Sequence, residues 1–172
     1  RVTTDRAETG PEPTPFDVTG PLPTGTVLLE ASAGTGKTWT IGALVTRMVA
    51  EGHADLDEML VVTFGRAASQ ELRERVRDQL VEAELVLGGG EVEGEPTSLV
   101  AMLRGWDPGR RREGHARVVA ALTAFDAATI VTTHQFCSMV LDSLGVAGDT
   151  DSSAELVEDL GDLRADAVDD LY

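Results

Sequence analysis

The chain has 172 residues, a formal net charge of −16 and a single cysteine. This length corresponds to one domain, or to one domain and part of another, and it is long enough to bury a core. No apolar run approaches the length of a membrane span, one cysteine excludes an internal disulfide framework, and the acidic balance argues against a simple basic nucleic-acid-binding module. We therefore expect a soluble protein of a reducing compartment, the cytoplasm.

Residues 1–24 are rich in proline and polar residues. This composition predicts a disordered or extended N-terminal arm that joins the fold near Phe16 or Leu22. The apolar run that follows, Val27–Glu30, is short and is typical of a parallel strand buried on both faces. A helix is predicted from about Gly36 to Ala50 and ends at Gly52. The stripe expected to face its core comprises Ile41, Leu44, Val45, Met48 and Val49.

A glycine-rich turn connects this strand to this helix, as in a phosphate-binding loop. The turn and its flanks read Glu30-Ala31-Ser32-Ala33-Gly34-Thr35-Gly36-Lys37-Thr38. Gly34 and Gly36 allow backbone N–H groups to point inward, and the helix N-terminus adds further donors. Lys37, the only lysine in the chain, is predicted to contact the β- and γ-phosphates, and Thr38 to ligate Mg²⁺. The alternative is an ordinary turn with a solvated lysine.

The remaining elements follow from periodicity and turn signals. Met59–Thr63 is a second buried strand, which is parallel to the first in a βαβ unit. Arg66–Leu87 is a long helix that buries Leu72, Val76, Leu80, Ala83 and Leu87 and stops at Gly88. The later elements are a short helix Thr97–Leu103, a turn Asp107-Pro108-Gly109, a helix Gly114–Phe125 with Val118, Val119 and Leu122 inward, a strand Ala128–Thr132, a helix Thr133–Leu144 and an acidic helix Ser153–Tyr172. The expected fold class is an α/β parallel sheet flanked by helices, with a helical C-terminal segment.

Two strand ends carry polar and aromatic residues. Thr63 and Phe64 follow the second strand and would share the carboxyl edge of the sheet with the glycine loop. An aromatic side chain there can stack on a base, but the residues alone favour a core Phe64 and a capping Thr63. The third strand ends in Thr132-Thr133-His134-Gln135-Phe136-Cys137. Metal or thiol chemistry at His134 and Cys137 is far less common than a capping histidine and a buried cysteine.

The apolar runs of this chain end at Glu30, Thr63 and Thr132. A phosphate-loop ATPase holds Mg²⁺ with an acidic residue at the end of another apolar strand. No run here ends in such an Asp-Glu pair, so we expect half of a hydrolytic site.

Together these stretches resemble the UvrD-like superfamily 1 DNA helicases, and within them the RecB family. The glycine loop with Ala31 resembles the first family motif, and Leu60–Phe64 with Ala67-Ala68 and Glu71-Leu72-Arg73 resembles the second. Thr132, His134, Phe136 and Cys137 resemble the Thr-x-His-x-Phe-Cys motif. The resemblance spans roughly residues 16–145.

The resemblance implies ATP-driven movement on single-stranded DNA and unwinding of duplex ends, coupled to a nuclease domain and to RecC- and RecD-type partner subunits. It implies that ATP with Mg²⁺ is held by the segment from Ala31 to Thr38. That segment comprises Ala31, Ser32, Ala33, Gly34, Thr35, Gly36, Lys37 and Thr38. It further implies that DNA is contacted by Thr63, Phe64, His134 and Phe136.

The resemblance also implies a domain plan and a boundary. Residues 1–24 are then the arm, 25–145 part of the first motor domain, and 146–172 the acidic helical start of an inserted subdomain. The Asp-Glu motif and the nuclease residues of the family would lie beyond Tyr172, so we expect an N-terminal fragment that is inactive alone. Two alternatives remain: a small phosphate-loop kinase with Arg104–Arg117 as a lid, and a non-catalytic nucleotide-binding module.

Overall fold

The computed structural model describes residues 14–32 and 34–144, which form five α-helices, two 3-10 helices and two strands. The chain divides into two compact units, residues 1–132 and 133–172, and each is described by itself. The described residues do not include residues 1–13, Ala33 or the predicted acidic helix Ser153–Tyr172.

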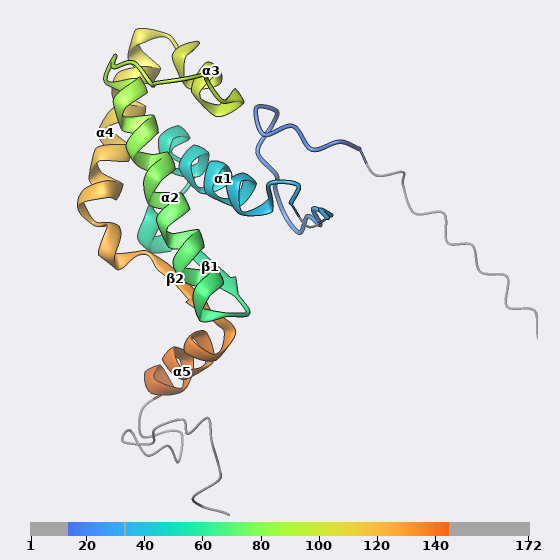
Figure 1. Ribbon diagram of the computed structural model, residues 1–172. Helices are drawn as coiled ribbons and strands as arrows, with labels where there is room; N and C mark the ends of the chain where they lie inside the picture. The colour runs from blue at the N-terminus through green and yellow to red at the C-terminus, as the bar shows by residue number, and fades with distance from the viewer. Residues whose placement is uncertain (1–13, 33, 145–172) are drawn as a thin grey trace, which may run out of the picture. The chain divides into compact units, whose positions relative to one another are not determined.

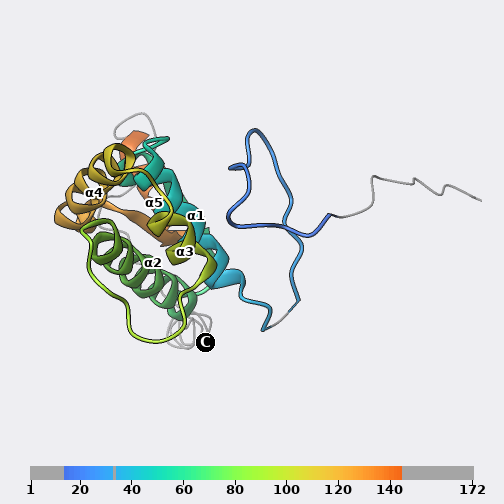
Figure 2. The ribbon, with the colours of Figure 1, turned by 90° about the horizontal axis from the view of Figure 1, so that it is seen from above.

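Three helices of the first unit pack against one another: α1 (Lys37–Glu51), α2 (Arg66–Leu87) and α4 (Pro108–Thr123). Figure 1 and the view from above in Figure 2 show them side by side, and α3 (Ser98–Arg104) lies against α2. The long helix confirms its sequence prediction, because α2 has the predicted bounds and the predicted stripe is buried.

Helix α1 has the predicted bounds within one residue but buries a different face. Its buried residues are Gly42, Ala43, Val45, Thr46, Arg47, Val49 and Ala50, whereas Ile41 is exposed and Leu44 and Met48 are half-buried. The predicted stripe is therefore wrong in part. A Cβ on Gly42 would lie 2.8 Å from Gln79 Oε1 of α2, so small residues allow the two helices to approach closely.

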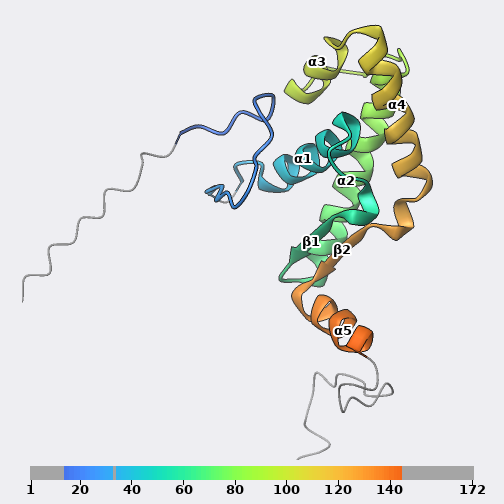
Figure 3. The same cartoon turned by 180° about the vertical axis from the view of Figure 1, so that it is seen from behind.

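The sheet contains two parallel strands, β1 (Leu60–Thr63) and β2 (Thr129–Thr132), each preceded by a 3-10 helix (Leu56–Glu58 and Phe125–Ala127). Figure 3 shows the strands side by side. Helix α2 covers the face that carries Val61 and Ile130. Leu60 and Val62 on the other face are exposed, so within the described residues only one face of the sheet is covered.

The predicted first strand is wrong for this structure. Residues 27–30 form no strand, and Val27, Leu28 and Leu29 are exposed, with Leu28 at 81%. A parallel strand is stable only when neighbouring strands satisfy its backbone groups, and the two described strands pair with each other instead.

The predicted turn at Asp107-Pro108-Gly109 is the beginning of α4. Asp107 is its N-cap and accepts from the N–H groups of Gly109 (2.9 Å) and Arg110 (3.1 Å), while Pro108 occupies the first helical position. Val118 is buried and Leu122 half-buried as predicted, but Val119 is exposed.

In the second unit, α5 (Thr133–Leu144) confirms the predicted helix. Among the helices described, none combines the length and apolarity needed to span a bilayer.

Candidate functional site

The glycine loop reaches α1 through two left-handed residues. Gly34 has φ 77° and Gly36, the N-cap of α1, has φ 86°, a region that side-chain-bearing residues rarely adopt. The turn between them is closed by Thr35, whose N–H and hydroxyl donate to the carbonyl of Ser32 at 3.4 and 2.8 Å. Both glycines therefore adopt a backbone conformation that favours glycine, while the predicted inward direction of the N–H groups stays a prediction.

The N-terminus of α1 is suited to an anion. The helix has no side-chain cap, and its first turn contains no acidic residue. The first N–H groups of a helix, together with its dipole, attract negative charge. The helix therefore offers donors at this end without a carboxylate that would repel an anion.

Lys37 is exposed and belongs to this first turn. Its ammonium donates to the carbonyl oxygens of Ala31 (3.0 Å) and Ser32 (2.5 Å). The side chain thus folds back along the loop. Thr38 follows it and is half-buried. The loop therefore gathers a cation, a hydroxyl and the helix donors within one short segment, while Ala33 lies outside the described residues.

The two strand ends in the first unit lie next to each other. Thr63 pairs in register with Thr132, so the residues that close β1 and β2 are neighbours. The Thr63 hydroxyl also donates to the Gly65 carbonyl at 3.3 Å. Phe64 is 96% exposed, and the N-cap of α2 is Gly65. The sequence interpretation of a core Phe64 and a capping Thr63 is therefore wrong.

The other strand-end residues lie on α5 in the second unit. His134 and Cys137 are exposed, and Phe136 is half-buried. The predicted buried cysteine is therefore wrong. The described residues contain no group of three or more His, Cys, Asp or Glu side chains arranged to hold a metal ion.

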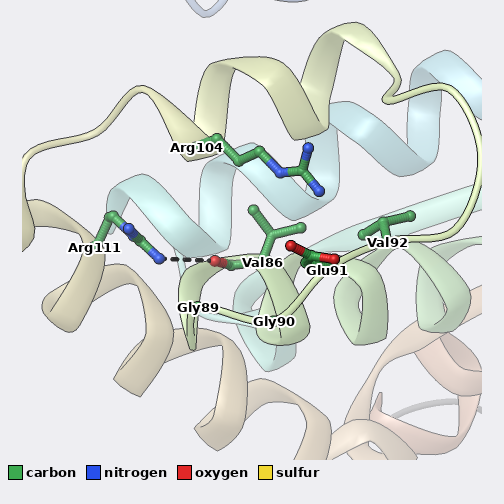
Figure 4. Close-up of a pocket in the computed structure, with 7 residues that line it drawn as sticks. All are labelled: Val86, Gly89, Gly90, Glu91, Val92, Arg104 and Arg111. Carbon is green, nitrogen blue, oxygen red and sulfur yellow. Dashed lines mark hydrogen bonds between the residues drawn. The ribbon is translucent and has the colours of Figure 1, made fainter.

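A hollow of about 390 Å³ lies at the C-terminal end of α2, away from the predicted site residues. Figure 4 shows Arg111 of α4 directing its guanidinium at the Val86 carbonyl, to which it donates at 3.1 Å. Arg104 also lines the hollow, together with Glu91. Arg111 satisfies a carbonyl at a helix end, so we assign it to the structure of this region and not to the glycine loop.

Arg47 was not singled out by the sequence patterns, yet it is bound to the chain that leads to the glycine loop. It is buried in α1 and donates to the carbonyl oxygens of Val18 and Gly20. The available signal was the spacing of Arg47 and Glu51, four residues apart on a mostly apolar helix.

Comparisons with known proteins place the chain in a family. Residues 17–168 match the UvrD/REP helicase N-terminal domain. The RecBCD enzyme subunit RecB of Mycolicibacterium smegmatis is 57% identical over 159 residues, which cover 91% of this chain and 14% of that protein. The protein of the same name from Mycobacterium tuberculosis is 53% identical over 161 residues, with the same shares.

A more distant relative has a different name. An ATP-dependent helicase/nuclease subunit of Clostridium perfringens is 30% identical over 156 residues, which cover 85% of this chain and 10% of that protein. The chain thus spans about one seventh of the length of the RecB proteins that it matches. From the domain match and these identities, the chain belongs to the UvrD/REP helicase family, on its RecB branch.

Proposed function

We propose that this chain is the N-terminal, ATP-binding part of a RecB-type ATP-dependent DNA helicase and exonuclease that acts in double-strand-break repair and recombination. The observation that carries this proposal is the glycine loop with its single lysine at the start of α1, in a chain 57% identical to a RecB protein. Neither the family match nor the relatives support the kinase alternative.

The loop residues fit a nucleotide triphosphate with Mg²⁺. The donors are the first N–H groups of α1, the Lys37 ammonium and the Thr38 hydroxyl, and the first turn of α1 has no carboxylate. In this assignment the phosphates are surrounded by Lys37, Thr38 and the loop residues before them, which are Ala31, Ser32, Ala33, Gly34, Thr35 and Gly36. Bound Mg·ATP supplies the free energy of phosphoryl transfer. The residues of this chain supply positive charge, backbone donors and one hydroxyl ligand for the cation.

We place DNA at the strand ends. Phe64, at 96% exposure, offers a ring face for a base, beside the paired Thr63 and Thr132. In the second unit, His134 and Phe136 of α5 are proposed separately as DNA contacts. Duplex ends and single strands are the proposed substrates, and RecC- and RecD-type proteins the proposed partners, in keeping with the names of the relatives.

The domain plan is also a proposal. Residues 25–145 would form part of a RecA-like motor domain, preceded by the arm 1–24 and followed at 146–172 by an inserted helical subdomain. The described strands end in Thr63 and Thr132, so the acidic Mg²⁺ ligand would come from a strand outside these residues. The exposed face with Leu60 and Val62 is a surface that a larger sheet and its helices would cover.

The test is a titration of the chain with a fluorescent ATP analogue and Mg²⁺. Loss of a charge-assisted contact in Lys37→Ala should weaken binding about tenfold or more. Arg75→Ala, which removes an exposed cation on α2, is the matched control and should bind as the unmodified chain does. Equal affinities for Lys37→Ala and the unmodified chain would remove Lys37 from its proposed role.

A second readout uses the unique lysine. A lysine-specific endoproteinase has one cleavage site in this chain, on the carboxyl side of Lys37. Mg·ATP should slow this cleavage, whereas Mg²⁺ alone should not. Cleavage at the same rate with and without saturating nucleotide would contradict binding at the loop.

A further inference from the structure

The segment that leads to the glycine loop is held at few points. Among the described residues between Thr14 and Gly36, Val18 alone is buried, at 8% exposure. The described part of residues 21–36 contains no helix or strand. The position of the loop therefore depends on its junction with α1 and on the contact of Val18 with the core.

Arg47 fixes that contact from within α1. Its Nη1 donates to the Val18 carbonyl at 2.6 Å and to the Gly20 carbonyl at 2.7 Å. The side chain is 5% exposed, so both bonds are shielded from water. Charge-assisted bonds in such a site are stronger than neutral ones in solvent.

The guanidinium is itself held in place by Glu51, one turn further along α1. Arg47 Nε and Nη2 lie 2.7 and 2.6 Å from Glu51 Oε1. The other carboxylate oxygen, Oε2, accepts from Arg110 of α4 at 3.0 Å, and the Arg110 guanidinium also stacks on Trp106. Residues of two helices, α1 and α4, therefore fix the orientation of the Arg47 side chain that contacts the arm.

The arm presents a preformed turn to this side chain. Asp17 Oδ1 accepts from the N–H and from the hydroxyl of Thr19, both at 2.8 Å, and the Gly20 N–H donates to the Asp17 carbonyl at 3.1 Å. The bonds from Thr19 hold the pKa of the Asp17 carboxyl below its usual range. The Val18 and Gly20 carbonyls are thereby directed to one donor.

We propose that Arg47 is a positioning residue for the nucleotide site: it clamps the Asp17–Gly20 turn onto α1, the helix that begins at the glycine loop. The proposal rests on the proposed function of that loop. A segment anchored at both ends has fewer conformations than one anchored only at Lys37, so ordering it around phosphate costs less free energy.

The test compares three variants in the Mg²⁺ titration with the fluorescent ATP analogue. Arg47→Met removes the clamp from the helix side, and Val18→Ser weakens it from the arm side without changing α1. Arg117→Met is the matched control, because it removes an arginine of α4 that donates to the Ala50 carbonyl of α1 and pairs with Glu113, away from Arg47 and Glu51. The first two should weaken binding about tenfold through the added cost of ordering the loop, and the control should stay within about twofold.

The rate of cleavage after Lys37 in the absence of nucleotide is a second measurement. It reports the mobility of the loop, whereas a general loss of stability would lower the melting temperature as well. This cleavage should be faster in Arg47→Met and Val18→Ser than in Arg117→Met at matched thermal stability. If Arg47→Met does not fold, Val18→Ser carries the test alone. Equal affinity and cleavage rates for the clamp variants and the control overturn the clamp. Absence of saturable binding by the unmodified chain overturns the nucleotide site, while the cleavage rates still test the clamp.

Discussion

Asp107 shows how one carboxylate determines where a helix begins. It satisfies two of the first N–H groups of α4, those of Gly109 and Arg110. These bonds, that to Arg110 foremost, lower the pKa of the Asp107 carboxyl. The ionised form is therefore favoured in the folded chain, and the cap contributes to stability as long as the carboxyl is charged.

Because ionised Asp107 stabilises the folded chain, its contribution to stability should depend on pH. A depressed pKa gives stability that is present above the unfolded-state value and is lost as the pH falls through the folded-state value. Asp107→Ala should lower the melting temperature by about 2–4 °C at pH 7. The difference in melting temperature between Asp107→Ala and the unmodified chain should decrease below about pH 4, where carboxyl groups titrate.

Asp107→Asn is the control for this experiment, since an amide oxygen also caps a helix but does not titrate. The difference in melting temperature between Asp107→Asn and Asp107→Ala should stay nearly constant over the pH range in which the unmodified chain loses its advantage. A gap between Asp107→Ala and the unmodified chain that widens on acidification would contradict the assigned cap.

At the scale of the elements, close contacts between backbones determine how α1 and α4 pack. Gly114 lies in the middle of α4, where a Cβ would come within 2.7 Å of the Trp106 ring and 3.2 Å of the Ala50 carbonyl oxygen of α1. Arg117 of α4 also donates to that carbonyl at 3.1 Å. The absence of a side chain at position 114 is thus a requirement of the helix crossing.

Gly114→Ala is therefore expected to destabilise the chain despite the better helix propensity of alanine. The propensity gain is about 1 kcal/mol, while overpacking at a well-packed contact costs about 1–3 kcal/mol. Urea unfolding should show a lower midpoint with an unchanged slope.

Gly105→Ala is the matched control, because Gly105 has negative φ and a Cβ there would meet only local carbonyls, the nearer at 3.3 Å. It should change the free energy of unfolding by less than about 0.5 kcal/mol. A Gly114→Ala chain as stable as Gly105→Ala would show that α1 and α4 separate easily.

At the scale of the whole molecule, the chain combines a formed glycine loop with a small sheet. The loop residues cluster at the start of α1, whereas both described strands end in threonine. Hydrolysis of a nucleotide in this class of site needs an acidic ligand as well as the loop. Neither of the two described strands contains such an acidic residue.

We accordingly expect negligible DNA-stimulated ATPase activity from the 172-residue chain. The measurement is phosphate release with Mg·ATP and single-stranded DNA, with Lys37→Ala as the background. Robust turnover that Lys37→Ala abolishes would contradict the prediction. It would mean that one of the carboxylates of this chain serves as the acidic Mg²⁺ ligand.

Local signals in the sequence determined the long helix and the loop. The bounds of α2 and its buried stripe were predictable because a 22-residue amphipathic pattern with a glycine stop has few alternatives. The left-handed conformations of Gly34 and Gly36 followed from a turn chemistry that is encoded in adjacent residues.

Tertiary structure alone decided the features that depend on residues far apart in the chain. Val27–Glu30 has strand composition but no paired neighbour among the described residues, and Phe64 is apolar yet exposed because no described element covers it. The buried face of α1 is set by small residues that permit close helix approach, which an apolar stripe does not reveal. The Arg47 clamp joins residues 27 and 29 positions apart, a separation over which sequence periodicity carries no information.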